Sequence, residues 1–285
     1  KYEYWFHYFK ILKRNEIPLY MISSIFRKDQ VFFKWYGGLN RKILGYVTHF
    51  FVQNETSRSL LAGLGLSNVT VSGDTRFDRV YENAAHPRDI ERVKRFSEGG
   101  KVLVGGSTWP EDEALLAELA NGRPGWRFII APHEIREAGI ARTEGAFPEA
   151  VRYSTLSAMS PDEPAPAKRT LIIDNVGMLS SLYQYGKIAF IGGGFGAGIH
   201  NTLEAAAFGV PVIFGPEYQK FQEARDLIDT GGGFSIMNYA ELEKIMGRLE
   251  DPGELERAGK AAAGYVAGKT GATAIILEEL AGQVS

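Results

Sequence analysis

The residues best suited to chemistry lie in residues 190–216, FIGGGFGAGIHNTLEAAAFGVPVIFGP. Seven glycines and one histidine, His200, separate two apolar runs in this stretch. Glycines permit left-handed backbone and close approach to a ligand, and the loop that holds Gly193 and Gly194 is expected to enter a helix near Asn201. Free backbone amides at such a helix start suit an anion, most simply a phosphate. The stretch lacks the GK[ST] of a P-loop and is not a GxGxxG turn of a nicotinamide-type fold.

Two side chains near the start of that helix admit both a functional and a structural interpretation. The run Asn201-Thr-Leu-Glu204 spells a capping box, in which Glu204 hydrogen-bonds back to its own helix start. In the functional interpretation, the Glu204 carboxylate accepts hydrogen bonds from ribose hydroxyls instead. His200 likewise either contacts a phosphate or sugar, or packs against the loop and bonds its backbone.

Short apolar strands and helices alternate along the chain, which is typical of parallel α/β sheets. The pattern predicts strands over 17–24, 48–54, 68–73, 101–108, 126–133, 170–175, 187–193 and 210–216, helices over 30–47, 55–65, 111–121, 177–186 and 200–209, and two or three more helices in the tail. The pattern restarts after a polar joint at 87–100. It therefore indicates two doubly wound units, residues 1–88 and 89–285, with the last helix a candidate to cross back to the first unit.

The loops that follow the predicted strands of the second unit indicate where a ligand would bind. Ligands of parallel sheets lie beyond the carboxyl ends of the strands. Five such loops are expected to converge there: 105–108, 131–135, 174–177, 192–201 and 215–221. The Pro-rich segment 161–169 is expected to be a surface loop and not a domain linker.

Composition excludes several classes of protein. The 285 residues contain no cysteine, so neither a disulfide framework nor a thiolate zinc site is possible. A net charge of −2 argues against nucleic acid as a partner. No apolar run approaches the roughly 20 residues of a membrane span. Because the chain begins with Lys1, we expect it to be the C-terminal part of a longer protein.

Charge and aromatic residues are concentrated near the start of the chain. Residues 1–50 hold nine Lys and Arg against three acids, and they include the aromatic clusters KYEYWFHYF and VFFKWYGG. Basic residues interleaved with aromatic rings suit an interface with anionic lipid headgroups. The alternative is a pair of helices whose aromatic residues form a core and whose lysines are solvated.

Several motifs in order along the chain resemble the bacterial 3-deoxy-D-manno-octulosonic acid (Kdo) transferases. FIGGGFGAGIHNTLEAAAFG is similar to the family's Gly-Gly…His-Asn-x-Leu-Glu-Ala-Ala signature, and FGPEYQKFQEA to its Phe-Gly-Pro-x-x-x-Asn-Phe. KYEYW looks like Glu-x-Glu-x-Trp, FVQNE like Gln-Asn-Glu, VTVSGDTRFD like Val-Thr-Gly-x-x-Lys-Phe-Asp, and GGSTWPEDE like Gly-Ser-Thr-x-x-Gly-Glu. The resemblance therefore covers most of the chain.

The resemblance implies a fold, a reaction and two sets of site residues. The fold is α/β of the GT-B type, with two Rossmann-like doubly wound domains facing a cleft, the N-terminal one incomplete. The reaction is inverting transfer of Kdo from CMP-Kdo to a lipid A precursor in lipopolysaccharide biosynthesis, without a metal or other cofactor. The implied donor-binding residues are Ser107, His133, Gly177, Gly193, Gly194, His200, Asn201 and Glu204. The implied acceptor and membrane residues are Glu3, Trp5, Lys10, Lys13, Arg14, Lys28 and Lys34.

The resemblance also implies a location and a missing part. A lipid A precursor lies in the cytoplasmic leaflet of the bacterial inner membrane, where the protein would be peripheral or anchored through an upstream segment. The family's general base is a glutamate expected upstream of Lys1. We therefore expect this chain alone to bind CMP or CMP-Kdo without turning it over, and robust transfer by residues 1–285 would refute that.

The sequence departs from the family at three motifs. Pro132-His133-Glu134 stands where the family has Pro-Arg-His, so His133 or Arg136 is a candidate to replace an arginine that pairs with phosphate. Met178 stands where Asp-Thr-x-Gly-Glu-Leu has its glutamate, and Lys1 replaces the first acid of Glu-x-Glu-x-Trp. Two other functions stay open: a nucleotide-sugar 2-epimerase of the GT-B fold, which would prefer UDP-sugars, and a non-catalytic module that binds a nucleotide or lipid.

Overall fold

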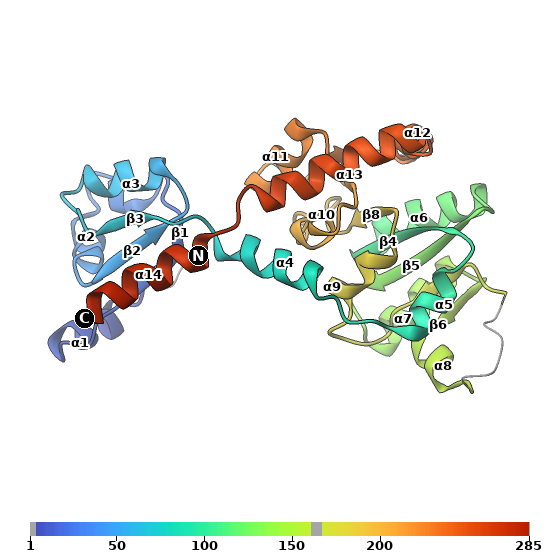
Figure 1. The fold of residues 1–285 in the computed structure, drawn as a ribbon, viewed down its shortest axis with the longest axis horizontal. Helices are drawn as coiled ribbons and strands as arrows, with labels where there is room; N and C mark the ends of the chain where they lie inside the picture. The colour runs from blue at the N-terminus through green and yellow to red at the C-terminus, as the bar shows by residue number, and fades with distance from the viewer. Residues whose placement is uncertain (1–3, 161–166, 285) are drawn as a thin grey trace. The chain divides into compact units, whose positions relative to one another are not determined.

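A computed structural model describes residues 4–160 and 167–284 and divides the chain into two compact units (Figure 1). The first unit contains the residues up to Arg79 and those from Lys269 onward, and the second contains Val80–Gly268. The division falls inside helix α4 (Thr75–Ala85), ahead of the boundary expected after residue 88. Two residues of the expected Glu-x-Glu-x-Trp segment, Lys1 and Glu3, lie outside the described residues.

The first unit is built on a three-stranded parallel sheet in the order β1-β2-β3. Its elements are α1 (Phe6–Arg14), β1 (Tyr20–Ser24), the 3₁₀ turn η1 (Val31–Phe33), α2 (Gly38–Leu44), β2 (His49–Val52), α3 (Glu55–Ala62), β3 (Val69–Val71) and α14 (Ala272–Val284). Phe9, Phe26, Phe32 and Phe50 form an aromatic core under these elements. Asn54 begins α3 because its side chain accepts a hydrogen bond from the Ser57 amide at 2.8 Å.

The single helix expected over residues 30–47 is wrong, because the structure has η1 followed by the short helix α2. Gly37 lies between them and packs against the preceding turn. A Cβ atom at Gly37 would lie 1.9 Å from the Val31 carbonyl oxygen. The glycine pair at 37–38 therefore allows a tight turn where helical periodicity alone suggested continuity.

The second unit is built on a seven-stranded parallel sheet in the order β10-β9-β8-β4-β5-β7-β6. Its strands are β4 (Lys101–Thr108), β5 (Trp126–Pro132), β6 (Ala150–Arg152), β7 (Thr170–Ile172), β8 (Ile188–Ile191), β9 (Val212–Phe214) and β10 (Gly233–Ser235). Its helices are α5 (Glu91–Ser97), α6 (Pro110–Gly122), α7 (Glu137–Ala146), α8 (Tyr153–Ala158), α9 (Leu179–Leu182) with the 3₁₀ turn η2 (Tyr183–Tyr185), α10 (Leu203–Ala207), α11 (Gln222–Thr230), α12 (Tyr239–Leu249) and α13 (Pro252–Ala267).

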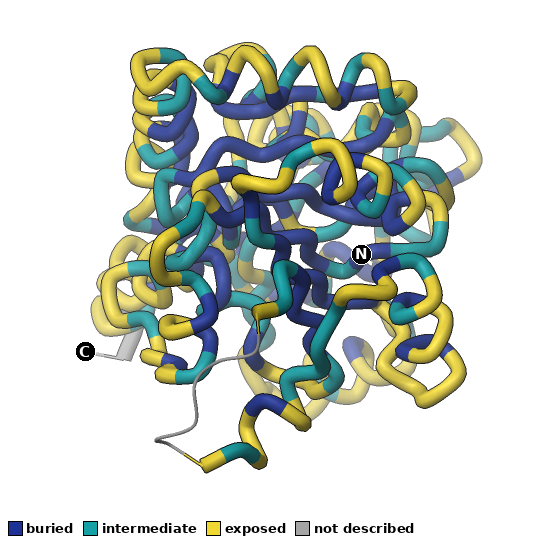
Figure 2. The backbone as a smooth tube through the Cα atoms, turned by 90° about the vertical axis from the view of Figure 1, so that its right-hand side faces the viewer, coloured by how far each residue is buried: buried dark blue, intermediate teal, exposed yellow. Residues whose placement is uncertain are grey.

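The core of this unit follows from its continuous apolar strands. All four residues of β8 are buried, as are six of the seven residues of β5, because helices cover both faces of the sheet. Figure 2 shows these buried backbone segments inside the unit and exposed segments around them. The parallel α/β class expected from the sequence is therefore confirmed in both units.

The tail of the chain contains more structure than expected. Four helices, α11 to α14, and the edge strand β10 replace the predicted two or three helices. The strand β6 also had no prediction. Both strands are only three residues long, too short to show an alternating apolar pattern.

The last helix, α14, belongs to the first unit. Asp78 fixes its start, since the Asp78 carboxylate accepts hydrogen bonds from the Gly271 amide at 2.6 Å and from the Thr273 amide at 2.7 Å. Ala272 and Ile276 of this segment are buried. Over the described part of the chain, no helix is both long and apolar enough to cross a membrane.

Candidate functional site

The candidate site lies at the carboxyl edge of the seven-stranded sheet, where β8, β4 and β5 are neighbours. From β4, the chain continues to β5 on one side, whereas β8 pairs with β4 on the other side. Such a change of direction leaves a crevice at the strand ends, the usual binding position in open parallel sheets. The end of β4 supplies Ser107, and the loops after β5 and β8 supply His133, the glycine loop and His200, all of which the sequence predicted to converge.

Three aromatic rings meet at this edge, and we call Trp109, His133 and His200 the ring cluster. His133 stacks on Trp109 and on His200, with ring centroids 4.6 Å apart in each pair and interplanar angles of 21° and 26°. The Trp109 indole Nε1 donates a hydrogen bond to His200 Nε2 at 3.2 Å. The structure therefore brings together two of the predicted donor residues and adds a tryptophan that sequence reasoning missed.

Local backbone geometry positions each ring. Ser107 has a left-handed φ of 53°, which turns the chain out of β4 toward Trp109. Pro110 then begins α6, as is common at a first helical position. The His133 amide donates to the Thr108 carbonyl at 2.9 Å, and the His200 amide donates to the Gly192 carbonyl at 3.1 Å.

The glycine loop, residues 192–198, lacks large side chains at Gly193 and Gly194 because the backbone there packs directly against other backbone. Gly193 has a φ of 91°, and a Cβ atom there would lie 2.6 Å from the Gly198 carbonyl oxygen. A Cβ at Gly194 would lie 2.5 Å from the Gly215 nitrogen. The Gly193 amide is also occupied, since it donates to Asp112. Gly193 and Gly194 are thus required by the fold of the loop, and their role in donor binding stays a prediction.

Asp112 connects the glycine loop to α6. Its Oδ2 atom accepts hydrogen bonds from the Trp109 amide and the Gly193 amide, both at 2.9 Å. Its other oxygen, Oδ1, is buried without a hydrogen-bond partner among the described residues. Burial raises the pKa of Asp112, against the lowering effect of the two amides. Asp112 therefore holds the loops after β4 and β8 together at a cost in desolvation.

Glu113 is a second buried carboxylate in the first turn of α6. It accepts hydrogen bonds from the Thr108 hydroxyl at 3.1 Å and the Thr143 hydroxyl at 3.0 Å. Burial raises its pKa, although the two hydroxyls oppose the shift. Because both partners are protein groups, Glu113 fixes α6 against β4 and α7 and does not reach the ring cluster.

The half-buried ring of His200 favours its neutral form. Burial lowers the pKa of His200, and the neighbouring His133 lowers it further. A neutral imidazole has one N–H donor and one acceptor nitrogen. The hydrogen bond from Trp109 assigns the acceptor role to Nε2.

The expected capping box at Asn201 and Glu204 is wrong in its details. Helix α10 begins at Leu203 with Thr202 as its N-cap residue, and it is only five residues long. The Asn201 side chain accepts from the Leu203 amide at 3.1 Å and donates to Glu204 Oε1 at 3.0 Å, so these two side chains bond each other. Asn201 is exposed and Glu204 is half-buried. Their contact with a donor stays a prediction.

Gly177 lies in the loop after β7, the strand next to β5. It is exposed and has a φ of 85°. In the same loop, Asp174 accepts a hydrogen bond from the Ser154 amide at 3.0 Å. Met178, which replaces the family's glutamate, is buried. This loop therefore shares the edge, but in the described part of the chain it forms no hydrogen bond or ring contact with the ring cluster.

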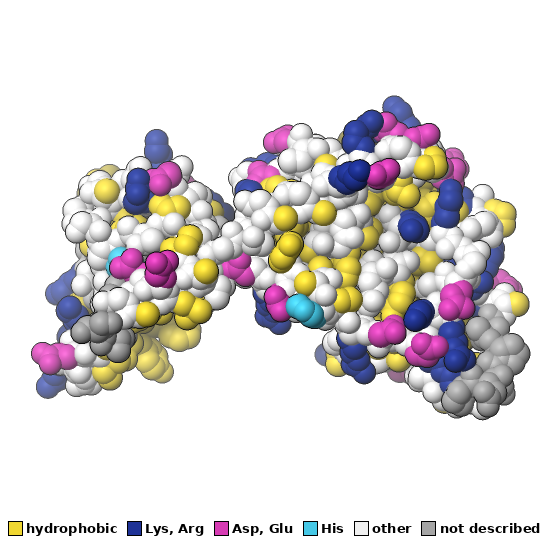
Figure 3. All heavy atoms as spheres, in the orientation of Figure 1, with side chains coloured by type: hydrophobic (Ala, Val, Ile, Leu, Met, Phe, Trp, Pro, Cys, Tyr) yellow, Lys and Arg dark blue, Asp and Glu magenta, His cyan; other side chains and the backbone are white. Residues whose placement is uncertain are grey.

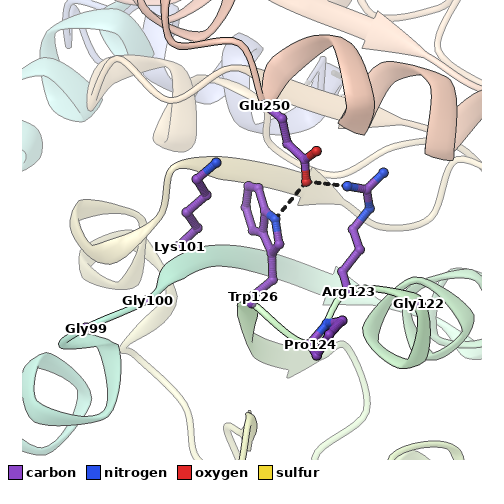
Figure 4. A pocket seen from close by; sticks show the side chains of 9 residues that line it. Gly99, Gly100, Lys101, Gly122, Arg123, Pro124, Trp126 and Glu250 are labelled. Carbon is purple, nitrogen blue, oxygen red and sulfur yellow. Dashed lines mark hydrogen bonds and ion pairs between the residues drawn. The ribbon is translucent and has the colours of Figure 1, made fainter.

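A second cavity, of about 660 Å³, lies at the opposite, amino edge of the same sheet (Figure 4). Glu250 is its central side chain and accepts hydrogen bonds from Arg123 and from Trp126 Nε1, the latter at 3.1 Å. Burial opposes the shift, but these two donors lower the pKa of Glu250. The Lys101 ammonium lies 5.7 Å from the centre of the Trp126 ring. Glu250, Arg123 and Trp126 therefore bond one another in this cavity, although the Arg123 Nε atom is buried without a hydrogen-bond partner among the described residues.

The described acceptor and membrane candidates of the first unit lie at or near its surface, whereas the aromatic residues around them are divided between surface and core. Lys10, Lys13, Arg14 and Lys28 are exposed, while Lys34 is half-buried. Large apolar side chains are exposed as well: Trp5, Tyr8, Ile11, Ile22, Trp35, Tyr36 and Leu39. Trp35 is 90% exposed, whereas Phe9, Phe26 and Phe32 are buried. Basic and hydrophobic side chains both reach the surface of this unit (Figure 3), so neither interpretation of the aromatic clusters holds for all of them.

A search for metal ligands gives a negative result over residues 4–160 and 167–284. No group of three or more His, Asp and Glu side chains in that part of the chain could hold a metal ion.

Sequence comparison identifies relatives with a known activity. Residues 1–79 match the family model described as 3-deoxy-D-manno-octulosonic-acid transferase (kdotransferase). The 3-deoxy-D-manno-octulosonic acid transferase of Rickettsia bellii is 28% identical over 75% of this chain and 52% of its own length. That of Bordetella pertussis is 26% identical over 98% of this chain and 67% of its own length. The chain thus spans about half of the first relative and two thirds of the second, and the resemblance drawn from the motifs is confirmed.

Solved structures share the fold. The C-terminal CMP-Kdo binding domain of WaaA from Acinetobacter baumannii superposes with a TM-score of 0.52 at 21% identity, over 65% of this chain and 96% of that domain. The UDP-GlcNAc 2-epimerase from Neisseria meningitidis, bound to UDP-GlcNAc, superposes with a TM-score of 0.61 at 18% identity, over 95% of this chain and 71% of that one. At these identities the likeness concerns the fold alone, and the GT-B type is confirmed.

Proposed function

Because this chain is related to the Kdo transferases and has a glycosyltransferase fold, we propose that it takes part in moving Kdo from CMP-Kdo to a lipid A precursor, with CMP-Kdo bound at the carboxyl edge of the seven-stranded sheet. The observation that carries this proposal is the convergence of Ser107, His133 and His200 at the β8-β4-β5 crevice. Relatives that align with 75% and 98% of this chain are named as Kdo transferases. The first unit would face the acceptor.

The proposed transfer is a displacement at the anomeric carbon of Kdo. The acceptor hydroxyl oxygen forms a bond to that carbon on one face, and the bond to the CMP phosphate oxygen breaks on the other, which inverts the configuration. The bonding electrons leave with CMP, and the hydroxyl proton passes to a general base. Residues of the donor site would stabilise the negative charge that develops on the leaving phosphate.

The side chains of the ring cluster suit that task. His133 is exposed at the end of β5, beside His200, and it stands where the family has a phosphate-pairing arginine. The stacked rings also give the crevice an aromatic surface, which suits a pyrimidine base. We therefore assign the phosphate to His133 and His200, and Ser107, Gly177, Asn201 and Glu204 to the surrounding sugar and base.

Nucleotide choice tests the proposal against the epimerase alternative. We expect isothermal titration calorimetry to detect CMP binding to the 285-residue chain and UDP binding at least roughly tenfold weaker, a difference of about 1.4 kcal/mol. His133→Ala should weaken CMP binding. Lys101→Ala, at the opposite edge of the sheet, is the matched control and should leave it unchanged. A preference for UDP would favour an epimerase. Equal loss of CMP affinity in His133→Ala and Lys101→Ala would contradict a binding site at the carboxyl edge.

We also propose that the exposed basic and aromatic residues of the first unit bind an anionic membrane surface at the cytoplasmic face of the inner membrane. Each basic residue near such a surface contributes about 1 kcal/mol. Replacing Lys10, Lys13, Arg14, Lys28 and Lys34 with Gln should lower sedimentation with phosphatidylglycerol vesicles by more than roughly tenfold. The matched control replaces five exposed basic residues of the second unit: Lys94, Arg95, Lys244, Arg257 and Lys260. If both variants lose the same amount of vesicle binding, the interaction depends on the net charge of the protein and not on a specific surface of the first unit.

A further inference from the structure

The Trp109 indole restricts the chemistry of His200. An indole N–H can only donate a hydrogen bond, so its partner nitrogen must be unprotonated. Trp109 Nε1 lies 3.2 Å from His200 Nε2, which is a normal hydrogen-bond distance. A neutral histidine whose Nε2 accepts carries its proton on Nδ1. The geometry thus selects one of the two neutral tautomers of His200.

Protonation of His200 would break this arrangement. The cationic ring has an N–H at both nitrogens, so Nε2–H would then point at the indole N–H and leave both donors unpaired. The other titratable groups around His200 are His133, stacked on the ring, Asp112, which bonds the adjoining glycine loop, and Glu204 on the following helix. Burial and His133 both lower the pKa of His200, in agreement with a neutral ring.

The remaining nitrogen of His200 has no hydrogen-bond partner among residues 4–160 and 167–284. In the described part of the chain, no residue forms a hydrogen bond with His200 Nδ1, while the backbone amide of His200 is already bonded to Gly192. A neutral Nδ1–H is a hydrogen-bond donor without a net charge. It would therefore recognise an oxygen atom of a ligand through a directional hydrogen bond and not through long-range electrostatic attraction.

We propose that Trp109 is a positioning residue of the donor site, which holds His200 in the Nδ1–H tautomer so that Nδ1–H donates to a phosphate oxygen of the bound cytidine nucleotide. The identity of the ligand in this proposal rests on the proposed function, whereas the tautomer of His200 does not. His133 and His200 then have separate tasks: His133 is the exposed ring that can meet the phosphate charge, and His200 is the fixed neutral donor.

The tautomer is measured without any ligand. Long-range ¹H–¹⁵N spectra of the imidazole rings, with His200 assigned by comparison with His200→Asn, should show Nδ1 protonated and Nε2 unprotonated in the full chain. Trp109→Phe keeps an aromatic ring on His133 but removes the N–H, so Nε2–H should appear and the pKa of His200 should rise. The matched control is Trp126→Phe, which removes an indole hydrogen bond to Glu250 at the opposite edge.

The role toward the ligand is measured with CMP. Asn places its amide nitrogen near the position of Nδ1, and Gln places it near that of Nε2. We expect His200→Asn to bind CMP more tightly than His200→Gln, and Trp109→Phe to bind it roughly three- to tenfold more weakly than wild type, as for loss of one hydrogen bond. Trp126→Phe should bind CMP like wild type.

Each outcome decides the proposal. An Nε2-protonated His200 in wild type, or an unchanged tautomer in Trp109→Phe, overturns it. So does full CMP affinity in a Trp109→Phe protein whose tautomer has changed. If wild type binds no CMP, the proposed function fails and the ligand part falls with it, while the spectra still settle the tautomer. If Trp109→Phe does not fold, the wild-type spectrum and the Asn and Gln variants remain decisive.

Discussion

The two edges of the seven-stranded sheet each contain a tryptophan whose indole N–H donates to a titratable side chain. At the amino edge, Trp126 donates to Glu250, and Glu250 also accepts from Arg123, so this carboxylate already has two protein donors. At the carboxyl edge, Trp109 donates to His200, whose second nitrogen has no partner among the described residues. Similar residues therefore serve stability at one edge and are available to a ligand at the other.

The difference between the two edges shows why the presence of a cavity is by itself a poor guide to the functional site in this fold. The cavity of about 660 Å³ lies at the amino edge, far from the loops that follow the strands. Glu250 and Arg123 already pair with each other there, so a ligand that bound either group would have to displace that contact. At the carboxyl edge, one ring nitrogen of His200 has no partner among the described residues, which is why we propose that edge as the site.

The largest expected effect comes from glycines of the two edges. Gly193→Ala should lower the free energy of unfolding by about 3 kcal/mol, since left-handed backbone costs about 1–2 kcal/mol and the overlap with the Gly198 carbonyl adds overpacking. Gly125→Ala, in the loop at the amino edge, has open space around the new Cβ and should be nearly neutral. Urea unfolding of both variants measures the contrast. Equal costs would mean that the glycine loop is not specially constrained.

Removal of the Asp112 carboxylate should have the next largest effect. Asp112→Ala leaves the buried Trp109 and Gly193 amides without their acceptor, at a net cost of about 2 kcal/mol after relief of carboxylate desolvation. CMP affinity should fall too, because the loops that hold Trp109 and His200 are no longer connected. Asp112→Asn retains one acceptor oxygen and should lose less of both. If Asp112→Ala is destabilised but binds CMP normally, the Asp112 hydrogen bonds contribute to stability and not to ligand binding.

Glu250→Gln tests the amino edge in the same way. It removes the charge that pairs with Arg123, whose side chain is only 13% exposed. We expect a loss of about 1–2 kcal/mol, less than for a fully buried pair because the Glu250 side chain is 37% exposed. CMP affinity measured by calorimetry should not change. Weaker CMP binding by this variant would contradict the assignment of a purely structural role to this edge.

The smallest expected effect is a pH dependence at the carboxyl edge. The pKa values of Asp112 and Glu113 are raised above their ordinary values of 3.8 and 4.5, so the folded protein retains protons that the unfolded chain has released. The free energy of unfolding should therefore fall as pH rises from about 4 through the raised pKa values, by less than about 1.4 kcal/mol per pH unit and proton. The pKa of His200 is lowered from 6.5, so its contribution is lost in the opposite direction, as pH falls below 6.5.

Matched variants separate these two contributions. Asp112→Asn should flatten the dependence at the acidic end, and His200→Asn should flatten it just below pH 6.5. Urea unfolding at closely spaced pH values gives both slopes. If neither substitution alters its slope, the protonation of these buried groups is not linked to folding.

The sequence predicted the strands that support the site better than the contacts within it. The prediction of β4 over 101–108 agrees with its observed bounds, and β5 ends one residue before its predicted end, because each is a buried apolar run between turn residues. The roles of Trp109 and Asp112 were missed. They bond residues 91 and 81 positions away in the chain, and no local pattern reports such contacts. The Pro110 helix start was the available signal that placed both residues at a strand end.

Two other errors have local physical causes. The helix predicted over 30–47 failed at Gly37, whose contact with Val31 depends on a turn that periodicity does not register. The capping box at Asn201 failed because α10 starts at Leu203, so Glu204 lies in its first turn and meets the Asn201 side chain. In both cases the residues of the pattern were present, but tertiary packing selected a different backbone.

The position of α14 has a consequence for how the protein forms. The first unit is interrupted in the chain by the whole of Val80–Gly268, and its last helix is held by the carboxylate of Asp78. During synthesis, the residues of the second unit are therefore complete before the first unit receives Ala272 and Ile276. Contacts of such large sequence separation form slowly. We therefore expect the first unit to receive its last helix only after the second unit has been synthesised.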